Sequence, residues 1–357
     1  MTEYRLPRPR LLALATGVPP FRLEQTDVAD FARDLFAGSY ADVERLMPVF
    51  ENAAIETRYS CVPLSWHTEP HGLKDRSALY VKNAVELLAD AAERALVKAG
   101  LEHHDIDAVV SVSTSGIATP SLDALVGERL SLRADVERAP LFGLGCAGGV
   151  LGLARSGQMA ISRPGSNVLL LVVELCGLTF RPNDGSKANV IATALFGDGA
   201  AAAVLSSDTE AALEAPVLGA WGEHTWPGTL DVMGWNVEDD GLGVLFSQNI
   251  PSIVRRDYMA ALERFLIANH LEIGDIDGFA VHPGGAKVVD ALEASLGLAP
   301  GYLIESRAVL RDFGNMSAAT VFFVLERVLA GAEKPKRILA SSLGPGFSAG
   351  FVVFEQT

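Results

Sequence analysis

The pattern of apolar and polar positions repeats at an offset of about 170 residues. Residues 88–112 run from an apolar-periodic helical stretch through LEHHDID to a short apolar segment, and residues 259–281 run from a similar stretch through LEIGDID to another. The spacing predicts a helix in each case. The short apolar segments, 108–112 and 278–281, have the length and composition of buried strands.

The same offset continues along the chain. The turn GLGCAGG at 143–149 falls opposite FGNMSAA at 313–319, and each turn opens a further helical stretch. Apolar strand segments recur later in each half as well. Short buried strands that alternate with helices indicate α/β layers. We therefore predict a duplicated α/β unit, with the two cysteine- and asparagine-bearing turns close together near a pseudo-twofold axis.

The predicted halves are residues 1–206 and 207–357. No linker rich in proline, glycine or serine separates them, so we expect them to share one core. Residues 207–258 have the composition of an insertion between the halves, with three of the four tryptophans and an acidic run at 238–240. We expect this region to line a cavity.

Charge and composition narrow the function. The chain of 357 residues has 29 basic and 44 acidic side chains, a net charge of −15, which disfavours general binding to nucleic acid or anionic membranes. Three cysteines give no disulfide framework, and no spacing suggests a metal site. The longest apolar run, 168–173, is too short to cross a bilayer. We expect a cytoplasmic protein with no nucleic-acid partner and no membrane span.

Cys146 is the first candidate for chemistry. It lies in the glycine-flanked turn at 143–149, directly before a predicted helix. A thiol at a helix N-terminus faces the positive end of the helix dipole, which favours the nucleophilic thiolate. A buried structural cysteine is the alternative, but the glycine-rich turn into a helix favours a nucleophile.

Two residues of the second half complete the candidate site. His282 follows the predicted strand at 278–281 and precedes a Pro-Gly-Gly turn, a usual place for a catalytic side chain in α/β folds. Asn315 lies in the repeat equivalent of the cysteine turn, where its amide could donate to an oxyanion. The alternatives are a hydrogen-bonded loop histidine and an N-capping asparagine.

With these residues in place, the chain resembles the thiolase-like ketosynthases, and most closely the chalcone synthase-like type III polyketide synthases of bacteria. The resemblance covers roughly residues 10–355. The motifs that carry it are GLGCAGG at 143–149, VELCGLTFR at 173–181, LFGDGAAA at 195–202, HPGG at 282–285, GNMSAAT at 314–320 and LGPG at 343–346.

The resemblance implies a thiolase-like duplicated αβαβα layered fold and a mechanism. Cys146 would take an acyl group from a starter acyl-CoA, and His282 would hold Cys146 as a thiolate in an ion pair. His282 and Asn315 would bind the thioester carbonyl of malonyl-CoA while it loses carbon dioxide. The product would be cyclised in the same cavity, to a pyrone or a resorcinol. The substrates are CoA thioesters, no cofactor is required, and the enzyme would be a homodimer.

The resemblance also assigns the walls of the site. Phe196 would be the gatekeeper between the CoA tunnel and the cavity. The positions that would line the cavity are Thr114, Glu174, Cys176, Thr179 and Ser317. The tunnel wall would include Gly284, Gly285 and Ala286. Arg58 and Lys287 would contact the CoA phosphates.

Several positions depart from the plant enzymes of this family. A gatekeeper phenylalanine is replaced by Val244, a cavity glycine by Trp235, and a cavity threonine by Cys176. A methionine that reaches the partner's cavity falls at Thr119. We therefore expect a reshaped pocket rather than plant chalcone chemistry.

Two other functions fit the same residues. A 3-oxoacyl-(acyl carrier protein) synthase of the fatty-acid initiation type shares the Cys–His–Asn set, but HPGG and GNMSA favour the polyketide synthase. A non-catalytic binding protein on the same fold is the second alternative, since fold does not prove activity. The intact Cys146, His282 and Asn315 argue against it.

Overall fold

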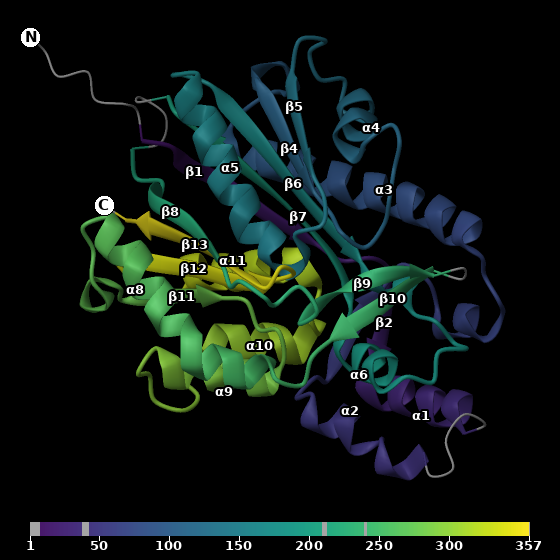
Figure 1. The fold of residues 1–357 in the computed structure, drawn as a ribbon. Coiled ribbons are helices and arrows are strands. Elements are labelled where there is room, and N and C mark those ends of the chain that lie inside the picture. Colours follow the sequence, from purple (N-terminus) through teal and green to yellow (C-terminus); the bar gives the residue numbers. More distant parts are fainter. Residues whose placement is uncertain (1–7, 38–42, 209–212, 239–240, 357) are drawn as a thin grey trace, which may run out of the picture.

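The structure is a computed structural model that describes residues 8–37, 43–208, 213–238 and 241–356 (Figure 1). Within these ranges nine strands form one central sheet. In spatial order they are β11 (Gly278–Val281), β12 (Arg337–Gly344), β13 (Ser348–Glu355), β8 (Val217–Thr225), β1 (Arg10–Gly17), β7 (Asp198–Ser206), β6 (Asn167–Leu175), β4 (Ala108–Val112) and β5 (Glu137–Leu141).

The remaining elements cover this sheet or stand beside it. The small strands are β2 (Phe21–Glu24), β3 (Thr57–Ser60), β9 (Met233–Glu238) and β10 (Gly241–Phe246). The α-helices are α1 (Gln25–Phe36), α2 (Pro48–Asn52), α3 (Leu73–Ala99), α4 (Leu122–Arg129), α5 (Gly148–Ser162), α6 (Lys187–Leu195), α7 (Ile250–Ile253), α8 (Met259–Ala268), α9 (Ala286–Ser295), α10 (Ile304–Phe313) and α11 (Thr320–Ala330). No helix in the described ranges is long and apolar enough to cross a membrane.

The sheet and its helices form five layers, as the family resemblance implies. Helices α5 and α11 pack against each other and against strands of both halves, in a core that includes Leu153, Phe322 and Phe354. Helices α3 and α4 cover the outer face of the first half of the sheet, and α8 and α9 cover that of the second half. The predicted αβαβα arrangement is confirmed.

The duplication is visible in the strand pairing. Strand β4 pairs in parallel with β6, and β11 pairs in parallel with β12; β6 then pairs with β7 in the antiparallel sense, as β12 does with β13. The two halves meet where β1 and β8 pair at Arg10 and Val217. One sheet therefore runs through both halves of the chain.

The repeated LExxDID segments have a physical explanation. In each half a short 3₁₀ helix, η3 (His103–Asp105) or η7 (Ile273–Asp275), begins with a capping box made by a glutamate and an aspartate. The last aspartate of each segment ties neighbouring strands together. Asp107 accepts from the N–H of Asn167 at 2.9 Å, and Asp277 accepts from the N–H of Arg337 at 2.7 Å. The repeat therefore fixes where parallel strands begin.

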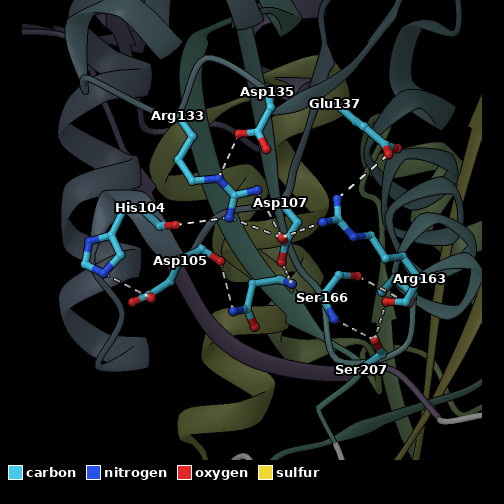
Figure 2. A network of polar contacts seen from close by, with 11 residues as sticks. His104, Asp105, Asp107, Arg133, Asp135, Glu137, Arg163, Ser166 and Ser207 are labelled. Atoms are coloured by element: carbon cyan, nitrogen blue, oxygen red, sulfur yellow. Dashed lines mark hydrogen bonds and ion pairs between the residues drawn. The ribbon is translucent and has the colours of Figure 1, made fainter.

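The polar network around Asp107 includes two arginines (Figure 2). Arg133 contacts the Asp107 carboxylate at 3.3 Å and Asp135 at 3.0 Å, and Arg163 lies 3.7 Å from Asp107. These contacts join the loop before β5, the end of α5 and the start of β6. They hold the edge of the first half in register.

The expected insertion at 207–258 needs correction. Strand β8 pairs with β13 along its length and is the second-half equivalent of β1, so it belongs to the main sheet. Helix α7 continues through a π-helical turn at Val254–Tyr258 into α8. Within the described part of this region, the β9–β10 hairpin is what stands apart from the sheet, and it does line a cavity. The apolar pattern alone did not identify β8 as part of the main sheet, because only its first residues are buried and the later ones are partly exposed.

Candidate active site

The turn around Cys146 is a 3₁₀ helix, η4 (Gly145–Ala147), that leads directly into α5. The N–H of Gly145 donates to the Thr114 hydroxyl at 3.0 Å. Gly145 has a φ of 48°, and a Cβ there would lie 2.5 Å from Pro345, so this position requires glycine. Cys146 is thereby held at the start of α5, only 7% exposed.

The turn around Asn315 lies against the cysteine turn, as the duplication predicts. Asn315 Oδ1 is 3.9 Å from Cys146 Sγ and accepts from the N–H of Ser317 at 2.8 Å. The Asn315 amide nitrogen donates to the carbonyl of Gly284 at 3.2 Å. Because these contacts fix both ends of the amide, Asn315 has one orientation next to the thiol.

His282 follows β11, and its N–H donates to the carbonyl of Ser341 on β12 at 2.8 Å. The side chain is buried, and within the described residues neither ring nitrogen has a hydrogen-bond partner. His282, Cys146 and Asn315 line the same small cavity, together with Met233 and Phe246. Buried polar groups are normally paired, so the two unpartnered ring nitrogens of His282 call for an explanation, and a role in binding substrate is one.

Burial controls the charges of the thiol and the imidazole. It raises the pKa of Cys146 to about 12 and lowers the pKa of His282 to about 3. In the site as folded, these shifts favour the neutral thiol and the neutral imidazole. The ion pair implied by the resemblance therefore requires that the attraction between the two charges offset these effects of burial.

A larger cavity extends from Cys146 and encloses about 580 Å³ of empty space, counting the part open to solvent. The predicted residues that line it are Thr114, Glu174, Cys176, Thr179, Phe196, Trp235, Val244 and Ser317. Sequence reasoning missed Met233 and Phe246, which also line it. Phe246 also borders the small catalytic cavity and the entrance, so it lies where the three spaces meet. Phe246 could have been predicted as a cavity residue, because it is two residues from Val244 and alternate side chains of a strand lie on the same face.

Val244 and Trp235 are directly opposite each other in the β9–β10 hairpin. Opposite residues of an antiparallel pair project to the same face. The indole N–H of Trp235 donates to the carbonyl of Thr114 at 3.2 Å, and its ring contacts Phe142 edge-on at 5.8 Å. Trp235 therefore occupies part of the space that a small side chain at Val244 leaves open.

Glu174 is a buried acid in the same cavity, at the end of β6. Its carboxylate accepts from the N–H groups of Thr114 and Ser115 at 3.1 and 2.9 Å, and from the Ser317 hydroxyl at 3.3 Å. Burial raises the pKa of Glu174 to about 7, although these hydrogen bonds act in the opposite direction. The group can therefore exchange a proton near neutral pH.

The entrance is lined by the predicted tunnel residues Gly284, Gly285, Ala286 and Lys287. Two further cations, Arg45 and Lys187, line the same opening, and sequence reasoning missed both. Neither belongs to a recognisable motif, since Lys187 starts α6 and Arg45 ends a short 3₁₀ turn. The fold alone brings the three cations to one opening.

Arg58 is not at this entrance, and the expectation that it contacts CoA phosphates is wrong for this structure. Its side chain is only 3% exposed. Its guanidinium donates to the carbonyls of Thr193, Ala194 and Phe196 and to the side chain of Gln25. Arg58 therefore caps the C-terminus of α6, where a cation is favoured by the helix dipole.

Comparison with known proteins gives matches over nearly the whole chain. Residues 7–209 match the N-terminal domain of chalcone and stilbene synthases, and residues 222–353 match their C-terminal domain. The chain is 35% identical to a putative chalcone synthase of Bacillus subtilis, over 97% of this chain and 98% of that protein. It is 37% identical to 1,3,6,8-tetrahydroxynaphthalene synthase of Streptomyces peucetius, over 96% and 92%.

A third relative and a solved structure extend the comparison. The alpha-pyrone synthesis polyketide synthase-like Pks18 of Mycobacterium tuberculosis is 30% identical over 96% of this chain and 90% of its own length. The crystal structure of 1,3,6,8-tetrahydroxynaphthalene synthase from Streptomyces coelicolor matches with a TM-score of 0.92 at 26% identity, over 98% of this chain and 99% of that one.

Proposed function

Because this chain belongs to the chalcone and stilbene synthase family and is a type III polyketide synthase, we propose that it loads an acyl-CoA starter on Cys146 and extends it with malonyl-CoA. The observation that carries this proposal is that Cys146, His282 and Asn315 border one small cavity. They come from two halves of the chain that the shared sheet holds together.

Loading begins with transfer of the Cys146 proton to His282. The thiolate attacks the starter thioester, an acyl-cysteine forms, and the CoA thiolate leaves as CoA after taking up a proton. The proton transfer creates a buried ion pair, in which each charge offsets the desolvation cost of the other. The attraction between the two charges would therefore support the thiolate in spite of burial.

Condensation uses the same two residues of the second half. His282 and the Asn315 amide donate to the thioester oxygen of malonyl-CoA, carbon dioxide leaves, and the enolate that remains is stabilised. The enolate carbon attacks the acyl-cysteine carbonyl, which releases Cys146 and leaves a chain two carbons longer on CoA. Both ring nitrogens of His282 are unpartnered within the described chain, which leaves them available for this role.

The CoA moiety would enter at the opening lined by Gly284, Gly285 and Ala286. We propose that Lys287, Arg45 and Lys187 at this opening bind its phosphates. Phe246 lies between this opening and the catalytic cavity. The pantetheine arm would therefore pass Phe246 to reach Cys146.

For the starter we propose a medium or long fatty acyl group, with two or three malonyl extensions and closure to a pyrone or resorcinol. Val244 leaves room that a flexible chain can fill, and each buried CH₂ gains about 0.8 kcal/mol. Trp235 on the same face takes up part of that room. We propose that its indole limits the number of extensions.

We also propose a homodimer. Ile117 and Phe142 are 58% and 52% exposed, although both are large and apolar. Ile117 lies two residues from Thr119, on the segment that the family resemblance places against the partner. A second copy of the chain would remove both side chains from water. Light scattering should give twice the monomer mass of 37.8 kDa, and a monomer at micromolar concentration would contradict the dimer.

The test of the starter is a competition in one tube between a fatty acyl-CoA and 4-coumaroyl-CoA, with malonyl-CoA and mass spectrometry of the products. We expect a higher kcat/KM for the fatty acyl ester. Val244→Phe should lower fatty-acyl use, because the ring closes the space. Preference for the coumaroyl ester, with fatty-acyl use unchanged in Val244→Phe, would refute the proposed starter.

A further inference from the structure

The imidazole of His282 has no hydrogen-bond partner on either ring nitrogen within the described residues. A catalytic histidine is usually oriented by a hydrogen bond to one of its ring nitrogens. Without such a bond, the position of the ring depends on its backbone and on the groups that hold that backbone. These groups therefore decide where the imidazole lies in the cavity that it shares with Cys146.

Two hydrogen bonds hold the backbone at this position. The carbonyl of Val281 accepts from the Ser306 hydroxyl at 2.6 Å, and the N–H of His282 donates to the carbonyl of Ser341 at 2.8 Å. Ser306 belongs to α10, whereas Ser341 lies on β12 opposite Val281 in the parallel pair. His282 is therefore held by a helix and by the neighbouring strand.

The side chain of Ser341 has a partner of its own. Its hydroxyl accepts from the phenol of Tyr258 at 2.7 Å, and both side chains are fully buried. The ring of Tyr258 also packs against that of Phe351 on β13, with 5.9 Å between the ring centres. Since no water reaches this hydroxyl pair, each group depends on the other for its hydrogen bond. One side chain therefore joins Tyr258 to the strand residue that binds the N–H of His282.

Tyr258 reaches this place through a local departure from α-helical geometry. It is the last residue of the π-helical turn Val254–Tyr258, which joins α7 to α8. Each extra residue in such a turn rotates the residues that follow by about 100° around the helix axis. At the start of α7, Ile250 lines the small cavity together with Cys146 and His282. One helical segment therefore borders both the cavity and the strand behind it.

We propose that Tyr258 is a positioning residue for the reaction: through Ser341 it fixes the backbone of His282 and holds the imidazole in the cavity that contains the Cys146 thiol. The inference rests on the proposed function, because it requires that His282 support the thiolate. Tyr258 itself is not among the residues that line the cavities of Cys146. The inference therefore predicts that a hydroxyl group outside the site changes the ionisation of the nucleophile.

The test measures alkylation of Cys146 by iodoacetamide as a function of pH, by mass spectrometry of its peptide and without substrate. The thiolate is the form that reacts, so the midpoint of the profile reports the ionisation of Cys146. Tyr258→Phe keeps the ring and removes the hydroxyl. It should raise the midpoint by about 0.7 pH unit and lower kcat by about fivefold with little change in KM, because a loosely held imidazolium stabilises the thiolate less.

The other groups that affect this titration stay the same in the variant. Besides His282, the titratable side chains among the described residues that line the cavities of Cys146 are Glu174 and Cys176. Burial raises the pKa of Cys146, and the charge of Glu174 adds to this effect. Tyr302→Phe is the matched control, because it removes the hydroxyl of a half-exposed tyrosine in the same half of the chain. It should leave the midpoint unchanged.

A double variant separates positioning from a purely structural role. Tyr258→Phe leaves the Ser341 hydroxyl buried without a partner, which lowers stability, and the addition of Ser341→Ala removes that hydroxyl and should restore Tm. The raised midpoint should persist in the double variant, because nothing holds position 341 through its side chain. A midpoint that returns to the wild-type value together with Tm would overturn the positioning role.

Two further single variants keep the outcomes distinct. Ser341→Ala removes the same hydrogen bond from its other side, so it should raise the midpoint equally and replaces Tyr258→Phe if that variant does not fold. His282→Ala sets the upper limit of the shift. A shift in His282→Ala without one in Tyr258→Phe or Ser341→Ala would overturn the positioning role alone. An unchanged midpoint in His282→Ala would overturn the ion pair of the proposed loading step, and the positioning role with it.

Discussion

The two halves of the molecule share a scaffold but differ in the side chains at its equivalent points. Four strands of each half follow the same order, β4-β6-β7-β1 and β11-β12-β13-β8, and β5 extends the first half alone. Both halves also have the same capping box and the same aspartate that ties parallel strands together. The offset of about 170 residues places Met316 opposite Cys146 and Val112 opposite His282. Each of these two proposed catalytic positions therefore has an apolar counterpart in the other half.

This difference shows how a duplicated fold can make one active site. The equivalent turns meet between the halves, where Cys146 Sγ lies 3.9 Å from Asn315 Oδ1. In the proposed mechanism, one half supplies the nucleophile, and the other supplies the two groups that act on the substrate carbonyl. Because the two turns meet at one place, a second set of catalytic side chains would have to occupy the same space between the halves as the first set.

Removing the nucleophile from the first half should have the largest effect. Cys146→Ala should abolish acyl loading and condensation, since neither other cysteine borders the small cavity that holds His282 and Asn315. Product formation is followed by mass spectrometry. Cys61→Ala and Cys176→Ala are the matched controls and should keep partial activity. Normal condensation by Cys146→Ala would remove the nucleophile assignment.

Removing either group from the second half should cost less. His282→Ala and Asn315→Ala should each reduce malonyl-CoA decarboxylation by about 10²–10³-fold, because each removes one donor to the enolate oxygen. Release of carbon dioxide measures this step without a starter. Wild-type decarboxylation in both variants would show that the second half does not stabilise the enolate.

The halves also differ at the ends of β6 and β12, where Glu174 falls opposite Gly344. Burial raises the pKa of Glu174 from 4.5 to about 7. As pH rises through this window, the unfolded state gives up its proton first, so the free energy of unfolding falls by about 3 kcal/mol.

Glu174→Gln should remove that decrease, because glutamine carries no titrating proton. Urea unfolding of both proteins at pH 5 and pH 8 gives the difference, and the variant should gain relative stability at the higher pH. Parallel pH profiles for wild type and variant would mean that the carboxyl titrates normally.

Overpacking the contact between the halves should lower the free energy of unfolding by a smaller amount. A Cβ on Gly149 of α5 would lie 2.2 Å from the carbonyl of Ala318, so Gly149→Ala should cost about 1–3 kcal/mol by overpacking. Gly274→Ala is the matched control, since a Cβ at that position would meet no heavy atom within 4 Å. Equal melting temperatures for the two variants would show that the halves do not meet tightly at this point.

Much of the scaffold could be predicted from the sequence, because it depends on local patterns. The strands expected at 108–112 and 278–281 coincide with β4 and β11. In both cases a short apolar run comes directly after the strand-tying aspartate, two residues beyond the aspartate of the capping box, and these features are encoded within a few residues. The family resemblance and the layered fold are likewise confirmed.

What could not be predicted depends on contacts between distant segments. Nothing near Arg58 in the sequence shows that it is buried, because its partners at the end of α6 lie about 135 residues away. Strand β8 falls in the expected insertion because only its pairing with β13 identifies it as part of the sheet. The entrance cations Arg45 and Lys187 come together only in the fold.

The most direct test of a site shared between the halves is to map the acyl group on the enzyme. The enzyme is incubated with a fatty acyl-CoA in the absence of malonyl-CoA, and its cysteine peptides are analysed by mass spectrometry. The acyl mass should lie on the Cys146 peptide, with slow loading in His282→Ala and retained loading in Asn315→Ala. An acyl group on Cys61 or Cys176, or loading of Cys146 that is independent of His282, would contradict the shared site.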